Sequence, residues 1–329
     1  MNLARRLWIA LLAAVLALAG IAVGALADES PPSYVRVFAG PGFMPGQVSS
    51  PEGMCFDAAG NLYVADRSNN RIQKFDKNGN LLKIVGSFGT GPGQLADPGD
   101  VGVDAAGNIY VMDETNVRVD KFDAAGNFVK MWGSAGILPG QFSEARGLCV
   151  QPNGTVWVAD RGNSRIQKFD TNGNLLQVWG TNGGEPGQFN DPRDIAIDAS
   201  GDIFVLDRRN YRVQHFDSNL NLINTWGSRG LNAGQFLYVR GMAIDGLGHV
   251  YVADGDANRI SKFNYQGTLL AMWSGPAGEL PWIEPRGLAA DAQGNLYVAD
   301  YGANRILLYS YGPSAVEGQS WSGVKNLYR

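Results

Sequence analysis

Arginine side chains recur at two fixed positions of an internal repeat, and a guanidinium group is well suited to binding an anion. Its planar fork of donors matches the oxygens of a carboxylate, phosphate or sulfate. The ligand-binding candidates, together with one nearby aromatic residue, are Arg146, Arg161, Arg193, Arg208, Arg240, Arg286 and Tyr301. They predict a site for an anionic protein, peptide or glycan ligand. The alternative is that each arginine pairs with a carboxylate of the protein itself, as buried charges commonly do.

Three carboxylates at the same or adjacent repeat positions suggest a different chemistry. Glu52, Asp100 and Asp194 could surround a hard divalent cation. A metal-assisted lyase or hydrolase is therefore the alternative to a binding role. The two histidines, His215 and His249, have no second ligand at a useful spacing, so no zinc site is predicted. Apart from such a cation we predict no cofactor, and we favour a non-catalytic role.

Both groups of residues belong to a repeat that fills most of the chain. Each copy is marked by the aspartate that closes the motif Tyr-Val-Ala-Asp or a variant of it, and an arginine follows five residues later. Successive marker aspartates lie 47, 47, 47, 47 and 46 residues apart. The six pairs are Asp66 and Arg71, Asp113 and Arg118, Asp160 and Arg165, Asp207 and Arg212, Asp254 and Arg259, and Asp300 and Arg305. Because the pair occurs in every copy, we expect it to brace a loop rather than to catalyse a reaction.

Each copy contains four short segments with the patterns of β-strands. In the first copy these are EGMCFD, NLYVAD, RIQKFD and LLKIVG, and Gly-containing turns or polar loops separate them. No room remains for a crossover helix. Four strands in a repeat of this length predict an all-β fold, a six-bladed β-propeller of four-stranded antiparallel blades.

The two ends of the repeat array predict how the ring closes. The last copy lacks a convincing fourth strand, whereas residues 34–48 resemble a fourth strand and a connector without the three strands before them. An N-terminal strand should therefore complete the last blade and protect the edges of the sheets. In such a ring the connectors and the loops after the marker aspartates share one face, around the mouth of the channel. The candidate arginines should gather there.

The repeat resembles the NHL repeat, whose family forms six-bladed propellers. The segment GNLYVADRSNNRIQKFDKNGN, at positions 60–80, and its counterparts in the other copies carry the resemblance. The family includes RNA-binding modules, sensor domains, scaffolds and the peptidyl-hydroxyglycine amidating lyase. That lyase holds zinc through histidines at connector ends, where this chain has Arg146, Arg193 and Arg286. Another group of propellers, the gluconolactonase-like hydrolases, has an acidic metal ligand at a place similar to that of Glu52.

The first 27 residues have the layout of a secretory signal peptide. Arg5 and Arg6 precede an apolar run over residues 7–24, and Ala25-Leu26-Ala27 is a small-residue cleavage pattern. We therefore expect an extracytoplasmic protein, periplasmic or secreted. The alternative is that residues 7–24 remain as a membrane anchor, as in a sensor ectodomain.

The sequence is therefore predicted to consist of three segments: a signal peptide or membrane anchor over 1–27, the propeller over 28–312, and a tail over 313–329 that matches no repeat. Removal of the signal peptide leaves 25 basic and 31 acidic residues, a net charge of −6. An acidic chain is a poor ligand for nucleic acid, which binds basic surfaces, so no nucleic-acid partner is predicted. Contact with a membrane is expected only through an uncleaved N-terminal segment.

Overall fold

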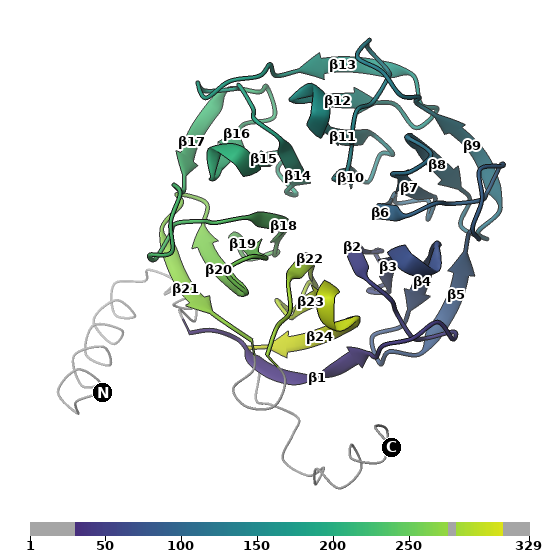
Figure 1. The fold of residues 1–329 in the computed structure, drawn as a ribbon, viewed down its shortest axis with the longest axis horizontal. Coiled ribbons are helices and arrows are strands. Elements are labelled where there is room, and N and C mark those ends of the chain that lie inside the picture. The colour runs from purple at the N-terminus through teal and green to yellow at the C-terminus, as the bar shows by residue number, and fades with distance from the viewer. Residues whose placement is uncertain (1–29, 276–280, 312–329) are drawn as a thin grey trace, which may run out of the picture. The chain divides into compact units, whose positions relative to one another are not determined.

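The chain folds into six four-stranded antiparallel sheets that surround a central channel (Figure 1). The computed structural model describes residues 30–275 and 281–311. Over those residues the only helices are four single turns of 3-10 helix: η1 (Arg67–Asn69), η2 (Arg161–Asn163), η3 (Arg208–Asn210) and η4 (Tyr301–Ala303). None of the helices in the described part of the chain is long and apolar enough to cross a membrane. The prediction of an all-β propeller with six blades is confirmed.

The strands occupy four concentric positions. The inner strands line the channel: β2 (Pro51–Phe56), β6 (Pro98–Val103), β10 (Leu148–Val150), β14 (Pro192–Ile197), β18 (Val239–Ile244) and β22 (Pro285–Ala290). The second strands are β3 (Leu62–Asp66), β7 (Ile109–Asp113), β11 (Val156–Asp160), β15 (Ile203–Asp207), β19 (His249–Asp254) and β23 (Leu296–Asp300). The third strands are β4 (Arg71–Phe75), β8 (Arg118–Phe122), β12 (Arg165–Phe169), β16 (Arg212–Phe216), β20 (Arg259–Asn264) and β24 (Arg305–Ser310). The outer strands are β5 (Leu81–Val85), β9 (Phe128–Trp132), β13 (Leu175–Trp179), β17 (Leu222–Trp226), β21 (Leu269–Trp273) and β1 (Ser33–Ala39).

The hydrophobic core lies between the blades. Every second strand is buried along its whole length, which explains its continuous apolar sequence. The described residues form six apolar clusters, and each cluster combines side chains from two adjacent blades. One residue from each connector enters these seams as a buried plug: Val48, Leu95, Phe142, Phe189, Phe236 and Trp282. A blade is therefore stabilised mainly by its neighbours, as in other repeat proteins.

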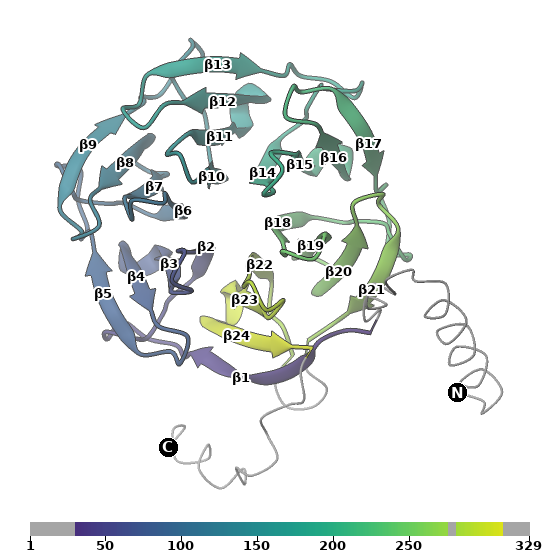
Figure 2. The same cartoon turned by 180° about the vertical axis from the view of Figure 1, so that it is seen from behind.

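The N-terminal strand closes the ring. β1 pairs antiparallel with β24, with Tyr34 opposite Tyr309 and Val37 opposite Leu307, so the predicted closure is confirmed. Phe38 anchors the strand because its ring packs edge-on against Tyr297 of the last blade, at a centroid distance of 5.0 Å. In Figures 1 and 2, which view the ring from opposite sides, β1 lies outside β24 at the circumference.

The chain enters and leaves the ring at the same face. The connectors and the loops that follow the marker aspartates lie on the other face, which we call the connector face. β24 begins beside a marker aspartate, since Arg305 is opposite Asp300, and it runs away from the connector face to Ser310. There it lies opposite Ser33, the first residue of β1. The segments before residue 33 and after residue 310 therefore start from the face opposite the connectors.

Candidate functional site

The connector face is held in place by a clamp that recurs in each blade. In the third blade, Asp160 accepts hydrogen bonds from the backbone of Ser143 at 2.7 Å and from Arg165 Nε at 2.7 Å. The remaining donors of Arg165 reach connector carbonyls, those of Ile137 and Leu138 at 2.8 Å and that of Gln141 at 2.9 Å. One guanidinium group thus fixes both the marker aspartate and the connector backbone.

The other five pairs are also in contact, but in the second blade Arg118 Nε donates to Asp120 instead of Asp113, and in the fifth blade Arg259 reaches Asp254 through Nη2. Their N to O distances are 2.7 Å for Asp66 and Arg71, 3.4 Å for Asp113 and Arg118, 2.8 Å for Asp207 and Arg212, 3.3 Å for Asp254 and Arg259, and 2.7 Å for Asp300 and Arg305. Burial raises the pKa of several of these carboxyls, including Asp66 and Asp207, although the arginine partner opposes the effect. The pairs brace the connectors, and this arrangement leaves them no open position for a ligand.

At the channel axis, the carboxylate of Glu52 lies among four guanidinium groups from four blades. Its Oε1 accepts hydrogen bonds from Arg193 at 2.6 Å, Arg146 at 2.7 Å and Arg286 at 3.3 Å. Its Oε2 accepts a hydrogen bond from Arg67 at 2.9 Å. We call these five residues the axial cluster. Glu114 joins its edge, 2.6 Å from Arg67 and 3.3 Å from Arg146.

Burial and neighbouring charges shift the pKa values of Glu52 and Arg193 in the axial cluster. Burial alone would raise the pKa of Glu52, but the positive charges of Arg193, Arg146, Arg286 and Arg67 lower it from 4.5 to about 2. Burial lowers the pKa of Arg193 from 12.5 to about 9, against the opposing effect of Glu52. Both groups therefore remain charged at neutral pH. Four guanidinium groups contact the two carboxylates Glu52 and Glu114, and Arg286 also lies 2.9 Å from Glu284, so the arginines of the cluster are paired with carboxylates of the protein.

The remaining candidate arginines, Arg161, Arg208 and Arg240, also pair with carboxylates, and Arg240 shares its partner with Arg286 of the axial cluster. Arg161 Nε lies 2.8 Å from Asp191, and Arg208 also binds Asp191. Arg240 and Arg286 share Glu284.

Two tyrosines add aromatic surface to the connector face. The ring of Tyr238 has the guanidinium groups of Arg208 and Arg240 at 4.4 and 4.2 Å from its centroid, and Arg286 lies 3.3 Å from the centroid of Tyr301. Such cation–π contacts orient the guanidinium groups.

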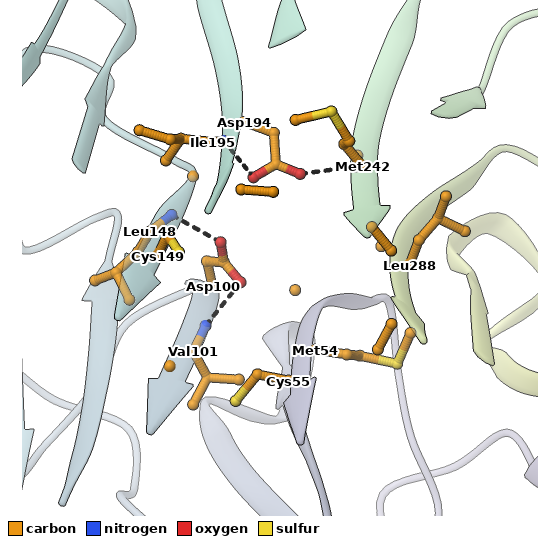
Figure 3. Close-up of a pocket in the computed structure, with 18 of the residues that line it drawn as sticks. Met54, Cys55, Asp100, Val101, Leu148, Cys149, Asp194, Ile195, Met242 and Leu288 are labelled. Carbon is orange, nitrogen blue, oxygen red and sulfur yellow. Dashed lines mark hydrogen bonds between the residues drawn. The ribbon is translucent and has the colours of Figure 1, made fainter. Parts of the chain in front are cut away.

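Below the axial cluster, the channel contains a cavity of about 350 Å³. Asp100 and Asp194 face into it, and Figure 3 shows both carboxylates among apolar side chains of the inner strands. Each bridges two blades through backbone N–H groups: Asp100 accepts from Val101 and Leu148, and Asp194 from Ile195 and Met242, all at 2.8 Å.

Burial raises the pKa of both channel carboxyls, and the negative charge of Asp194 adds to the effect on Asp100. The pKa of Asp194 reaches about 6, whereas that of Asp100 is well above 3.8. At the repeat position of Asp100 and Asp194 the other four blades have glycine, and none of these four glycines leaves room for a side chain. A Cβ at Gly53 would lie 1.9 Å from Asp100, and one at Gly287 would lie 1.7 Å from the carbonyl oxygen of Glu52.

The structure brings the candidate arginines to one face, but it separates the three candidate metal ligands. Both oxygens of Glu52 are occupied by arginine, and both oxygens of Asp100 and Asp194 are occupied by backbone amides. Within residues 30–275 and 281–311, no three His, Cys, Asp or Glu side chains are grouped as metal ligands.

The histidines and cysteines lie away from the axial cluster. His215 Nε2 is 3.0 Å from Asp202, and His249 Nδ1 is 2.7 Å from Asp245, both toward the face opposite the connectors. Cys55 and Cys149 are free thiols in the channel wall, and burial raises the pKa of Cys149 to about 12.

Sequence reasoning missed the carboxylates that complete the site. Glu114 follows a marker aspartate, in the position that holds arginine in three other blades, and Asp191 and Glu284 directly precede an inner strand. When the copies are aligned, the position just before the inner strand holds an acid in four of them: Asp97, Glu144, Asp191 and Glu284. These acids predict that arginines of the connector face pair with carboxylates.

Comparison with known proteins agrees with the fold and the repeat. The family model described as NHL repeat matches residues 49–75, 142–169, 189–216 and 283–308, which fall in blades one, three, four and six. The chain is a six-bladed β-propeller that contains NHL repeats. A segment of 37 residues is 54% identical to the protein lin-41 of Caenorhabditis elegans, and it covers 11% of this chain and 3% of that protein.

Solved structures share the fold at low sequence identity. A streptogramin B lyase structure is 15% identical with a TM-score of 0.58, and the alignment covers 84% of this chain and 96% of that one. An auxiliary nutrient binding protein from Bacteroides thetaiotaomicron is 13% identical with a TM-score of 0.62, covering 83% and 75%. At these identities the likeness extends to the propeller fold alone.

Proposed function

We propose that this NHL-repeat propeller is an exported binding or scaffold module that engages an anionic protein, peptide or glycan ligand at the mouth of its channel. The observation that carries the proposal is the convergence of arginines from four blades on the carboxylate of Glu52 at the channel mouth. Arginine is the side chain best suited to bind a carboxylate or a phosphate through paired hydrogen bonds.

Exposed apolar side chains on the same face support a macromolecular partner. They stand at the connector tips and are between 55% and 77% exposed: Phe43, Met44, Phe88, Ile137, Leu138 and Leu231. Large apolar residues at this exposure are typical of interaction surfaces. The clamp arginines hold these connectors by their carbonyl oxygens, so a partner would meet a preformed surface.

The position of the chain ends is compatible with export. Both ends of the ring lie on the face opposite the connectors, so an N-terminal segment, whether cleaved or retained, would begin away from the channel mouth. The export part of the proposal has its own test. N-terminal sequencing of the mature protein should give Asp28, whereas an intact N-terminus in the membrane fraction would favour an anchored protein.

The binding part is tested with a fluorescein-labelled poly-glutamate peptide and anisotropy. Arg146 is the most exposed arginine of the axial cluster, with 22% of its side chain accessible, and Arg146→Ala should weaken binding by about tenfold, the loss of one charge-assisted pair. Lys77→Ala, on the opposite face, is the matched control and should leave affinity unchanged. Equal affinities of the wild type and Arg146→Ala would count against the proposal.

A further inference from the structure

One residue in each copy lies at the start of the inner strand, at the channel mouth, and Glu52 is the only acid among these six residues. The corresponding residues in the other copies are Gly99, Arg146, Arg193, Arg240 and Arg286. A single acid therefore stands where four copies have arginine. It is also deeply placed, since only 6% of its surface is exposed.

The contacts of Glu52 are those that arginines make with a bound carboxylate. Three guanidinium groups converge on Oε1 and one on Oε2, from a total of four blades. The blades are also joined by the apolar seams and by the bridges of Asp100 and Asp194. The side chain thus occupies a site built from cations.

The backbone and the side chain of Glu52 differ in their freedom to move. The carbonyl oxygen packs so closely on Gly287 that a Cβ there would approach it to 1.7 Å, and the strand is therefore fixed. The side chain has three rotatable bonds and ends at the mouth of the channel. A change of rotamer about these bonds would move the carboxylate away from the guanidinium groups without any movement of the strand.

We propose that Glu52 is a built-in ligand that keeps the anion site closed, and that an external carboxylate or small oxyanion binds by replacing it among Arg67, Arg146, Arg193 and Arg286. This inference rests on the proposed function and adds a competing group to it. The affinity of the wild type for an anion is then reduced by the fraction of molecules in which Glu52 occupies the site.

The charges beneath the axial cluster determine the side from which the anion arrives. Asp100 and Asp194 face the cavity directly below, so an anion approaching through the channel would meet two carboxyl groups. Approach from the connector face meets the arginines first. The replacing group should therefore belong to a molecule or a partner that docks on the connector face.

The test compares the wild type with Glu52→Gln, which removes the competing charge and nearly preserves size. Binding of inorganic sulfate is measured by isothermal titration calorimetry at constant ionic strength. The variant should bind sulfate at least about tenfold more tightly than the wild type, because the closed state no longer competes. Glu185→Gln is the matched control: it removes an exposed connector carboxylate outside the axial cluster, and its affinity should remain within about threefold of the wild type.

The outcomes separate this inference from the proposed function. Equal sulfate affinity in the wild type and Glu52→Gln, or the same gain in Glu185→Gln, would overturn the built-in ligand while leaving the anion site in place. Absence of binding of both sulfate and poly-glutamate by every protein would overturn the proposed function as well. If Glu52→Gln does not fold, Glu52→Asp retains the charge on a shorter side chain. It should bind sulfate more tightly than the wild type, and unchanged affinity would again refute the inference.

Discussion

Asp120 should make the stability of this propeller depend on pH, and the dependence should disappear when the residue is replaced by glutamine. In blades one, three and four, the same position of the third strand holds Gln73, Gln167 and Gln214. Gln167, for example, donates to the marker Asp160 at 3.0 Å and to the carbonyl of Gln141 at 2.7 Å. Because an amide does not titrate, the side chain of Gln167 keeps both hydrogen bonds at every pH.

In the second blade a carboxyl group replaces that amide. Asp120 is fully buried next to the marker Asp113, and Arg118 Nε lies between them, 2.8 Å from Asp120 and 3.4 Å from Asp113. Its Oδ1 has no hydrogen-bond partner among the described residues. Burial raises the pKa of Asp120 from 3.8 to about 7, Arg118 opposes the shift, and the negative charge of Asp113 adds to it. One of the two carboxyls therefore holds a proton that the unfolded chain releases in weak acid.

The sign and size of the effect follow from this proton. Between pH values of about 4 and 7, the folded protein keeps a proton that the unfolded chain has lost, so stability must fall as pH rises through this range. The difference between 3.8 and about 7 corresponds to up to about 4 kcal/mol. The stabilisation by this group is complete below a pH of about 4 and absent above about 7.

The assay is urea unfolding of the wild type and Asp120→Gln over this pH range. The difference in unfolding free energy between them isolates Asp120 from other titrating carboxyls such as Asp194. Asp120→Gln should be more stable at neutral pH, and its advantage should shrink by about 2–4 kcal/mol toward pH 4. Gln167→Asp is the matched control and should introduce the same dependence in the third blade. A difference between wild type and Asp120→Gln that does not change with pH would refute the reasoning.

Other predictions concern the clamp, the channel and the closing strand. Arg165→Ala should lower the unfolding free energy by about 3–5 kcal/mol, since it leaves a buried aspartate unpaired, and Arg165→Lys should lose less; urea unfolding of both decides this. Gly287→Ala should prevent folding or lower the thermal midpoint strongly, because the new Cβ meets a backbone oxygen at 1.7 Å, whereas Gly184→Ala, with open space around it, should be neutral. Phe38→Ala should cost about 3–5 kcal/mol in the same urea assay if β1 closes the ring, and a loss below about 1 kcal/mol would contradict that closure.

The sequence was sufficient for the fold because the repeat encodes it six times. The spacing of the marker aspartates, the turn residues and the missing fourth strand of the last copy together require a closed ring. Each blade also packs on its neighbours through equivalent residues. A pattern seen in one copy therefore predicts the contacts of the next.

The site was predictable only in part, because its contacts link residues that no local pattern relates. Glu52 meets Arg193, which lies 141 residues away, because the blades face one another across the channel. Repeat alignment placed both residues at the channel mouth. Whether an arginine turns toward the axis or back onto a connector carboxylate depends on acids such as Asp191 and Glu284, which precede the inner strands and lie outside the two arginine positions of the repeat.

The location of the anion site can be tested directly by crystallography. A crystal of the protein soaked in selenate, with data collected at the selenium absorption edge, would locate the anion by its anomalous scattering. We predict a selenium peak at the channel mouth in contact with at least two of Arg146, Arg193 and Arg286, with the Glu52 side chain turned away from them. A selenate bound elsewhere, beside an axial cluster in which Glu52 keeps its four arginine contacts, would contradict the account.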